Sequence, residues 1–215
     1  MSDDPSAAPP REPERAEDAR LGEAFWRFSL ALYAQPGAAE RCLSLQDRAG
    51  WDVNLVLWAL WAGLRRGAPS PEAVRSAASL SAQWREDVVA PLRRIRRTLK
   101  IRLAKAEGRA SADAERLDAG LFRESVKVLE LQAEERQQRA IAAFAAEAEP
   151  PVGPATARRL FEALRLSRDR AAVGAEQEAA QEAAKEEEDW SALLTIAQQI
   201  DPALGRALDA APQRS

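Results

Sequence analysis

The sequence predicts an all-α protein, a compact helical bundle of about five helices, and three features indicate this class. Residues that favour helices dominate the 215-residue chain, which contains 47 alanines and 27 arginines. β-branched residues, which favour strands, are scarce. From residue 21 onward, apolar side chains recur every three or four positions, as they do on one face of an amphipathic helix.

The first twenty residues are predicted to form a disordered tail. They contain six acidic and three basic side chains, several prolines and no apolar run, so they resemble neither a signal peptide nor a transit peptide. The longest apolar stretch, residues 55–64, is about half as long as a membrane-spanning helix. We therefore expect a soluble cytoplasmic protein in which Cys42 is reduced.

The first two helices are expected between residues 21 and 48. Apolar residues recur at helical spacing over 21–33, and Pro36 and Gly37 then suit the two central positions of a type II turn. A second helix should follow over 38–48. Gly50 is expected to end it, because glycine readily adopts the left-handed conformation at a helix C-terminus.

The third helix is predicted to be the centre of the bundle. Asp52 is placed to cap it, and apolar side chains nearly encircle residues 53–66. A helix that is apolar all round is expected to be buried.

Two long helices should follow. Ser70 and Pro71 suit the cap and the first position of a fourth helix, whose apolar stripe runs over 74–103. Pro91 interrupts this stripe and should kink the helix near Val88, because proline has no N–H to donate. A fifth helix is expected over 112–147, and its middle, residues 134–139, is wholly polar. Its predicted apolar face consists of Phe122, Val126, Leu129, Ala133, Ala140 and Phe144.

A proline-rich segment gives the clearest boundary in the chain. Residues 149–154 contain three prolines and a glycine, which cannot continue a helix. We predict a helical bundle domain over 21–149, a linker over 150–154 and a helical extension rich in alanine and glutamate over 155–215. This extension should be partly disordered and loosely attached, because it has little apolar surface to bury.

The composition excludes several classes of enzyme. Without histidine, the protein cannot be a Ser-His-Asp hydrolase or a Cys-His protease, or use a histidine ligand or base. Cys42 is the single cysteine, which excludes internal disulfides and cysteine clusters, and it is expected to be an inert core thiol. The sequence predicts no catalytic residue, cofactor or metal site. If the protein is an enzyme, aspartate, glutamate or arginine must do the chemistry.

The charge pattern is strongly segregated. Residues 85–109 sum to a net charge of +6, and residues 110–215 sum to −7. On a regular helix, four basic residues of this segment point outward together, opposite the apolar stripe: Arg93, Arg96, Arg97 and Lys100. Such a face suits an acidic partner.

Two other interpretations of the basic face remain open. It is a solvated surface, or it is neutralised by the acidic residues at 176–189. Binding of nucleic acid through residues 93–105 is less favoured. No aromatic residue is interleaved with the basic residues of this segment, and the isoelectric point of the chain is about 5.4.

Five polar residues between the second and third helices form a candidate site: Gln46, Asp47, Arg48, Asp52 and Asn54. Their carboxylate and amide oxygens suit a small ligand or a divalent cation. In the structural alternative, Asp52 caps a helix, Asp47 pairs with an arginine such as Arg48 or Arg27, and Asn54 satisfies a loop carbonyl.

Tryptophans are dense in the first hundred residues. Four of them are candidates for a pocket or a partner groove: Trp26, Trp51, Trp58 and Trp61. The alternative is a core built from large side chains. Trp51 lies beside a glycine in a predicted loop, so we expect it to be partly exposed.

Ordered strings of residues also carry a resemblance to a known family. They are Phe25-Trp26-Arg27-Phe28-Ser29-Leu30, Leu32-Tyr33, Pro36-Gly37, Cys42-Leu43, Leu45-Gln46-Asp47-Arg48, Asp52-Val53-Asn54-Leu55, Trp61, Trp84-Arg85-Glu86 and Val88-Val89-Ala90-Pro91-Leu92-Arg93, followed by Arg97 and Lys100. They resemble, over roughly residues 21–144, an uncharacterised proteobacterial family, domain of unknown function 2390. The resemblance implies a small, soluble, helical bacterial protein and supplies no catalytic residues.

Two functions follow as expectations. The first is a non-enzymatic interaction or adaptor protein that binds an acidic protein partner through the arginine-rich face. The alternative is a ligand-binding or enzymatic bundle whose pocket is lined by aspartate, asparagine and tryptophan.

Overall fold

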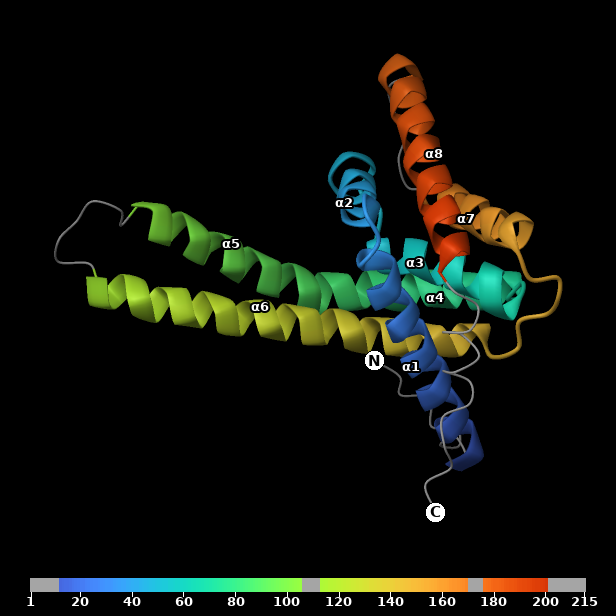
Figure 1. Cartoon of the computed structure of the whole chain (residues 1–215), viewed down its shortest axis with the longest axis horizontal. Coiled ribbons are helices and arrows are strands. Elements are labelled where there is room, and N and C mark those ends of the chain that lie inside the picture. The colour runs from blue at the N-terminus through green and yellow to red at the C-terminus, as the bar shows by residue number, and fades with distance from the viewer. Residues whose placement is uncertain (1–11, 106–112, 170–175, 201–215) are drawn as a thin grey trace, which may run out of the picture.

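The computed structural model describes residues 12–105, 113–169 and 176–200. Within these ranges the fold is all-helical, which confirms the predicted class (Figure 1). The helices are α1 (Glu12–Tyr33), α2 (Ala38–Ala49), α3 (Val53–Trp61), α4 (Pro71–Trp84), α5 (Ala90–Lys105), α6 (Asp113–Ala142), α7 (Pro154–Asp169) and α8 (Glu176–Gln199). The prediction of about five is too low, because the long fourth helix divides into α4 and α5 and because α7 and α8 join the bundle.

The predicted signals at the helix ends are confirmed. Gly37 and Gly50, with φ of 80° and 66°, adopt the left-handed conformation on either side of α2. The Asp52 side chain caps α3. Ser70 caps α4, and Pro71 occupies the first turn. None of the helices in the described ranges is long and apolar enough to cross a membrane.

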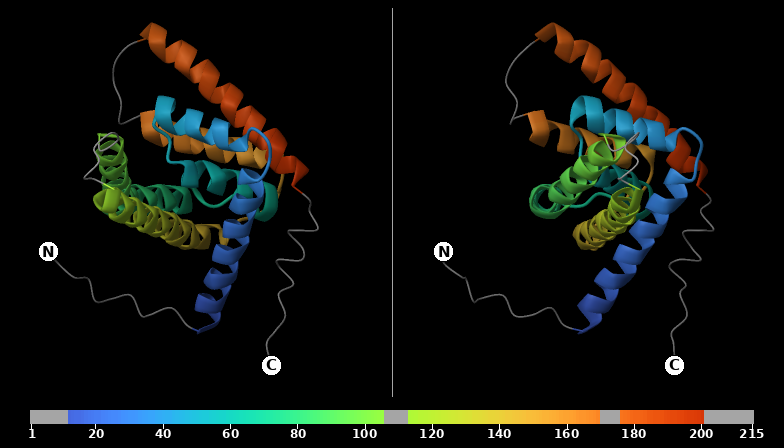
Figure 2. Two further views of the ribbon diagram at one scale, coloured as in Figure 1. Left: turned by 60° about the vertical axis from the view of Figure 1, so that its left-hand side comes forward. Right: turned by 90° about the vertical axis from the view of Figure 1, so that its left-hand side faces the viewer.

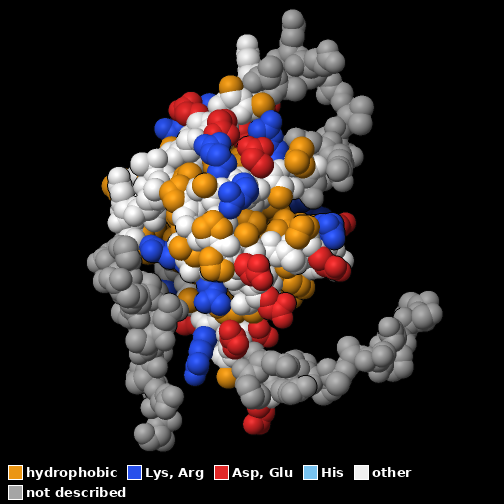
Figure 3. All heavy atoms as spheres, turned by 90° about the vertical axis from the view of Figure 1, so that its right-hand side faces the viewer, with side chains coloured by type: hydrophobic (Ala, Val, Ile, Leu, Met, Phe, Trp, Pro, Cys, Tyr) orange, Lys and Arg blue, Asp and Glu red, His pale blue; other side chains and the backbone are white. Residues whose placement is uncertain are grey.

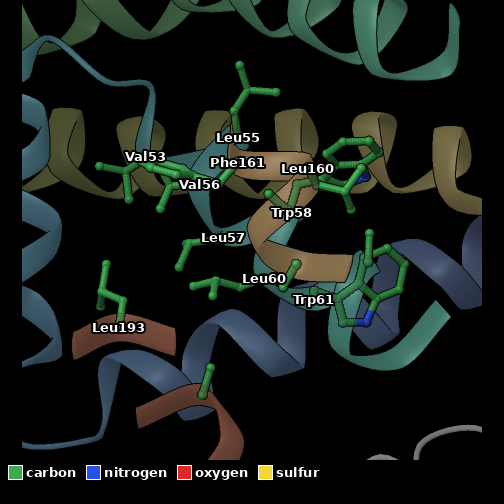
Figure 4. Close-up of a cluster of buried hydrophobic side chains, with 14 of the residues drawn as sticks. Val53, Leu55, Val56, Leu57, Trp58, Leu60, Trp61, Leu160, Phe161 and Leu193 are labelled. Carbon is green, nitrogen blue, oxygen red and sulfur yellow. The ribbon is translucent and has the colours of Figure 1, made fainter. Parts of the chain in front are cut away.

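α3 lies at the centre of the bundle, as its sequence predicts. Its side chains are buried, with Asn54 as the exception. Figure 4 shows its valine, leucine and tryptophan side chains beside Leu160 and Phe161 of α7 and Leu193 of α8. A π-helical turn, η1 (Ala62–Arg66), continues α3, and there α7 comes so close that a Cβ on Gly63 would overlap the backbone of Ala157.

α7 and α8 belong to the same hydrophobic core as α3. Trp190 of α8 is fully buried and stacks on Phe161 with 4.1 Å between ring centroids. The expectation of a loosely attached extension is therefore wrong for α7 and α8, because their aromatic side chains complete the core. Residues 170–175 and 201–215 of the predicted extension lie outside the described ranges. The division of the chain into domains at 150–154 stays a prediction.

The N-terminal helix starts earlier than expected. α1 begins at Glu12, so residues 12–20 extend this helix by about two and a half turns and are not part of an irregular tail. Residues 1–11 of the predicted tail lie outside the described ranges.

α5 and α6 form a long antiparallel hairpin that projects from the bundle (Figures 1 and 2). Of the apolar face predicted for α6, Val126 and Ala133 are buried, whereas Phe122 and Leu129 are 55% and 51% exposed. The face of the molecule opposite the hairpin tip mixes hydrophobic, basic and acidic side chains (Figure 3). Within the described structure, α5 packs mainly against α6 and against the turn that precedes it.

A π-helical turn, η2 (Arg85–Val89), joins α4 to α5 at the position where a kink was predicted. Here the N–H of Ala90 donates to the carbonyl of Arg85, five residues earlier. Pro91 follows directly and has no N–H to donate. The helix accommodates the proline by widening one turn, which inserts one residue into the helical repeat.

Candidate functional site

A cavity of about 440 Å³ lies between α1, the start of α3, η2 and α6. Its floor consists of buried residues: Ser29, Trp51, Gln137 and Gln138. Its rim consists of exposed residues: Leu30, Tyr33, Arg85 and Leu131. A buried polar floor under a largely apolar rim is the arrangement expected of a site for a small organic molecule.

Four polar side chains that line the cavity form a continuous chain of hydrogen bonds, which we call the amide relay (Asp52, Gln137, Asn54 and Gln138). Gln137 Nε2 donates to Asp52 Oδ2 at 3.1 Å. Asn54 Nδ2 donates to Gln137 Oε1 at 2.6 Å, and Gln138 Nε2 donates to Asn54 Oδ1 at 2.8 Å. The relay therefore joins the start of α3 to the middle of α6.

Ser81 anchors the relay to α4. This residue is fully buried, and its hydroxyl donates to Asp52 Oδ2 at 2.9 Å. Its backbone carbonyl accepts from Gln137 Nε2 at 3.0 Å. Asp52 Oδ1 accepts from the N–H of Asn54 at 3.0 Å, so the same carboxylate caps α3 and holds α4 and α6.

An ion-pair cluster lies beside the cavity at the base of the hairpin. Arg93 Nε and Nη2 lie 3.1 Å from Glu130 and 2.5 Å from Glu134, and Arg96 Nε lies 2.5 Å from Glu130. Burial raises the pKa of Glu134, although its pairing with Arg93 acts in the opposite direction. Arg93 and Glu134 also line the cavity.

This cluster corrects the predicted arginine face. Arg97 and Lys100 are exposed, but Arg93 and Arg96 turn toward α6 and pair with its carboxylates. The cause is the extra residue in η2. After Ser81 and Trp84, a regular helix would bring residues 88, 92 and 95 to the inner face, and the π turn shifts this face by one residue to Val89, Arg93 and Arg96.

The acidic residues at 176–189 do not neutralise the predicted arginine face within the described structure. Asp189 and Glu188 instead form ion pairs with Arg41 of α2, whose Nη1 lies 2.8 Å from Asp189 Oδ1 and 3.0 Å from Glu188 Oε1. Burial opposes ionisation of Asp189, but hydrogen bonds from Arg41 and Ser44 outweigh it and lower its pKa. These contacts attach α8 to α2.

The five candidate polar residues separate in the structure. Gln46, Asp52 and Asn54 line the cavity. Asp47 is exposed and accepts from Gln46 Nε2 at 3.3 Å, and among the described residues it forms no ion pair with Arg48 or with Arg27, which pairs with Glu23. Arg48 lines a different cavity, of about 310 Å³, between α2 and α8.

The four candidate tryptophans also separate. Trp26 and Trp51 line the cavity, whereas Trp58 and Trp61 are buried in the core and do not reach it. The expected partial exposure of Trp51 is wrong: it is 3% exposed, because Phe161 of α7 stacks on its ring at 4.7 Å. Cys42 is buried, and burial raises the pKa of its thiol to about 11, as suits the predicted inert thiol.

Sequence reasoning missed Ser81, Gln137, Gln138 and Glu134. The signal for three of them was the wholly polar run at 134–139 within an otherwise periodic apolar helix. Polar residues in the middle of a packed helix must find polar partners, and here they find the cavity and the relay. No group of three or more acidic or cysteine residues in the described ranges is placed to hold a metal ion.

The family model for proteins of unknown function designated DUF2390 matches residues 24–141. The chain belongs to this family. All the residues that line the 440 Å³ cavity, from Trp26 to Gln138, fall within the DUF2390 match. Neither a curated protein nor a solved structure matches the chain. The chemistry of the cavity in this DUF2390 protein is therefore defined by its own lining residues.

Proposed function

We propose that the protein binds a small organic ligand in the 440 Å³ cavity between α1, α3, η2 and α6. The observation that supports this most directly is the convergence of Asp52, Asn54, Gln137 and Gln138 on the cavity wall. Burying amide and carboxylate groups is costly unless they are hydrogen-bonded. We infer that such groups beside an open cavity orient a polar ligand and do not only hold the helices together.

The rim supports the same function. Leu30 and Leu131 are 49% and 52% exposed, and Trp26 lies beside them in the cavity lining. These side chains offer apolar contact to the body of a ligand whose polar end reaches the floor. The cavity volume is within the range of about 300–1,000 Å³ that is usual for small-molecule sites.

A variant that blocks the cavity tests this proposal. Leu131→Trp places a large ring at the rim, on an exposed helix position that tolerates substitution. Leu121→Trp is the matched control, since Leu121 is also exposed on α6 but does not line the cavity. Each protein is equilibrated with a bacterial metabolite extract, separated from free compounds and examined by mass spectrometry.

The wild type and Leu121→Trp are expected to retain the same compound, and Leu131→Trp is expected to lose it. Retention of no compound by the wild type would contradict the proposal. Equal retention by Leu131→Trp would also contradict it, because the compound would then bind elsewhere.

The hairpin supports a second candidate, binding of an acidic protein partner. Arg94, Arg97 and Lys100 are exposed and form no ion pair with the described residues. Ile95 and Ile101 are exposed beside them. A surface that combines cations with large apolar side chains is typical of a protein interface.

The test is affinity capture from a bacterial lysate with Arg97→Glu/Lys100→Glu. The control, Arg75→Glu/Arg159→Glu, makes the same charge change at exposed arginines outside the hairpin. A partner lost from the first variant and kept by the second would support the hairpin as the interface. Identical partners for both would rule out this candidate.

A further inference from the structure

The hydrogen-bond polarity of the amide relay limits the chemical class of the ligand, and this inference rests on the proposed function. Amide nitrogen only donates and amide oxygen only accepts, so the partners of each end decide how an amide is oriented. The relay contains three amides in series, which begin at Asp52 and end at Gln138. If the orientation of the first amide is known, then the orientations of the other two follow from it.

Gln137 is the fixed member. Its Nε2 faces Asp52 Oδ2 at 3.1 Å and the backbone carbonyl of Ser81 at 3.0 Å. A peptide carbonyl can only accept, and the Asp52 carboxylate already accepts from the N–H of Asn54 and the hydroxyl of Ser81. Gln137 must therefore present its nitrogen to these acceptors and its oxygen to Asn54.

The remaining orientations follow in order. Gln137 Oε1 accepts from Asn54 Nδ2 at 2.6 Å, which turns Asn54 Oδ1 toward Gln138. Asn54 Oδ1 then accepts from Gln138 Nε2 at 2.8 Å. The last group of the series is Gln138 Oε1, and the relay can end only on a hydrogen-bond acceptor.

This acceptor is buried and has no partner among the described residues. Gln138 is 2% exposed and lines the cavity, and nothing in the described structure donates to its Oε1. A buried carbonyl without a donor costs free energy, and a ligand that donates to it recovers this cost. The unpaired Gln138 Oε1 therefore favours a ligand that carries a hydrogen-bond donor.

The charges around the cavity disfavour an anion. Two carboxylates, Asp52 and Glu134, line it together with Arg85 and Arg93. Arg93 is already paired with Glu130 and Glu134, and Arg85 lies at the exposed rim. An anion bound at the floor would lie beside acceptors and carboxylates without a free cation next to it.

We propose that the ligand is an uncharged or cationic compound of the carboxamide or amidine type, which donates an N–H to Gln138 Oε1 once the Gln138 amide, whose oxygen is closed to solvent in the free protein, turns toward the cavity. Its apolar body lies against Trp26, Leu30 and Leu131. An acceptor-only group of the same shape, such as a carboxylate, is disfavoured at Gln138 Oε1 because two acceptors would face each other.

Three compounds of nearly the same shape separate these possibilities. Benzamide is neutral and donates, benzamidine is cationic and donates, and benzoate is anionic and only accepts. Each is titrated into protein labelled with ¹⁵N at its six tryptophan indoles. Trp26 and Trp51 report on the cavity, and Trp58 and Trp190, buried elsewhere in the core, are internal controls. The signals are assigned with single Trp→Phe variants.

We expect benzamide and benzamidine to shift the Trp26 and Trp51 signals and to bind roughly tenfold more tightly than benzoate, the effect of about one hydrogen bond to a buried acceptor. Gln138→Met, which keeps the side-chain length without the amide, should abolish this preference. Gln132→Met, on the exposed face of the same helix, should keep it.

Binding of benzoate as tightly as benzamide would overturn the inference and leave the proposed function intact, since the cavity would still be occupied. Binding of none of the three compounds would overturn the inference as well. Only the metabolite capture described above then decides whether the cavity has a ligand. If Gln138→Met does not fold, the comparison of the three compounds on the wild type is sufficient by itself.

Discussion

The centre of the bundle and the projecting hairpin are held together by different forces. Around α3, contacts are almost wholly apolar and include the stack of Trp51, Phe161 and Trp190. At the base of the hairpin, Val89 of η2 and Val126 of α6 are buried, and Arg93 and Arg96 of α5 form ion pairs with Glu130 of α6. Farther out, Ile101, Leu121 and Phe122 are more than half exposed.

This difference shows where the free energy of folding is concentrated. Apolar burial contributes in proportion to the area removed from water, whereas partly exposed ion pairs contribute little. The centre should therefore determine global stability, and the hairpin should open locally at lower cost. The cavity lies where the two regions meet, so its lining joins a rigid floor to a more easily deformed wall.

The largest effect is expected from removal of an aromatic ring at the centre. Trp190→Ala deletes a fully buried side chain that stacks on Phe161, and it should lower the free energy of unfolding by about 3–5 kcal/mol. Phe122→Ala, on the hairpin, should change it by less than about 0.5 kcal/mol, because this ring is largely exposed. Urea unfolding followed by circular dichroism measures both. Equal losses would refute the assignment of stability to the centre.

Two glycines provide the next comparison. Gly63→Ala should cost about 1–3 kcal/mol, because the new methyl group overlaps the backbone of Ala157 where α7 crosses η1. Gly120→Ala should instead gain up to about 1 kcal/mol, since this helical glycine on α6 faces open space and alanine favours the helix. Thermal unfolding of the pair is the measurement, and a stabilised Gly63→Ala would show that α7 does not approach η1 so closely.

The smallest effect is expected at the ion pairs. Glu130→Gln removes the carboxylate that both Arg93 and Arg96 contact, and should cost about 1–2 kcal/mol, between the values for exposed and buried pairs. Glu124→Gln, at an exposed pair nearer the outer end of the hairpin, should have almost no effect. Hydrogen exchange should show faster exchange at the base of α5 and α6 in Glu130→Gln and unchanged protection in α3. Faster exchange throughout the bundle would argue against a locally opening hairpin.

The sequence predicted the parts of the fold that depend on local chemistry. The caps Asp52 and Ser70, the glycine at position 50 and the central α3 all follow from residue types and short-range spacing. The packing of α8 did not, because the apolar residues that attach it, such as Trp190 and Leu193, lie at the end of a long alanine and glutamate run. Trp190 and Leu193 pack in one core with residues of α7 and α3, and α3 lies far from α8 in the sequence.

The site was predicted only in part for a similar reason. Asp52 and Asn54 stood out because they interrupt an apolar region, but their partners Gln137 and Gln138 lie more than eighty positions later. Arg93 and Arg96 were predicted to point outward, and they turn inward because a helical projection assumes 3.6 residues per turn throughout. Pro91 marked the interruption, yet composition does not say whether a proline bends a helix or widens a turn.

The π turn at Arg85–Val89 has a consequence for how this region tolerates changes in length. The rod from α4 to α5 contains one residue more than a regular helix needs, so deletion of one exposed residue, Glu86 or Asp87, would let the chain form a uniform helix in which Val89, Arg93 and Arg96 still face α6. In a chain of unchanged length, a uniform helix would instead rotate everything beyond η2 by about 100° relative to α4. Leu92 and Ile95 would then face Glu130, and Arg93 and Arg96 would turn toward water. The extra residue in the π turn therefore decides whether charged or apolar side chains of α5 face α6.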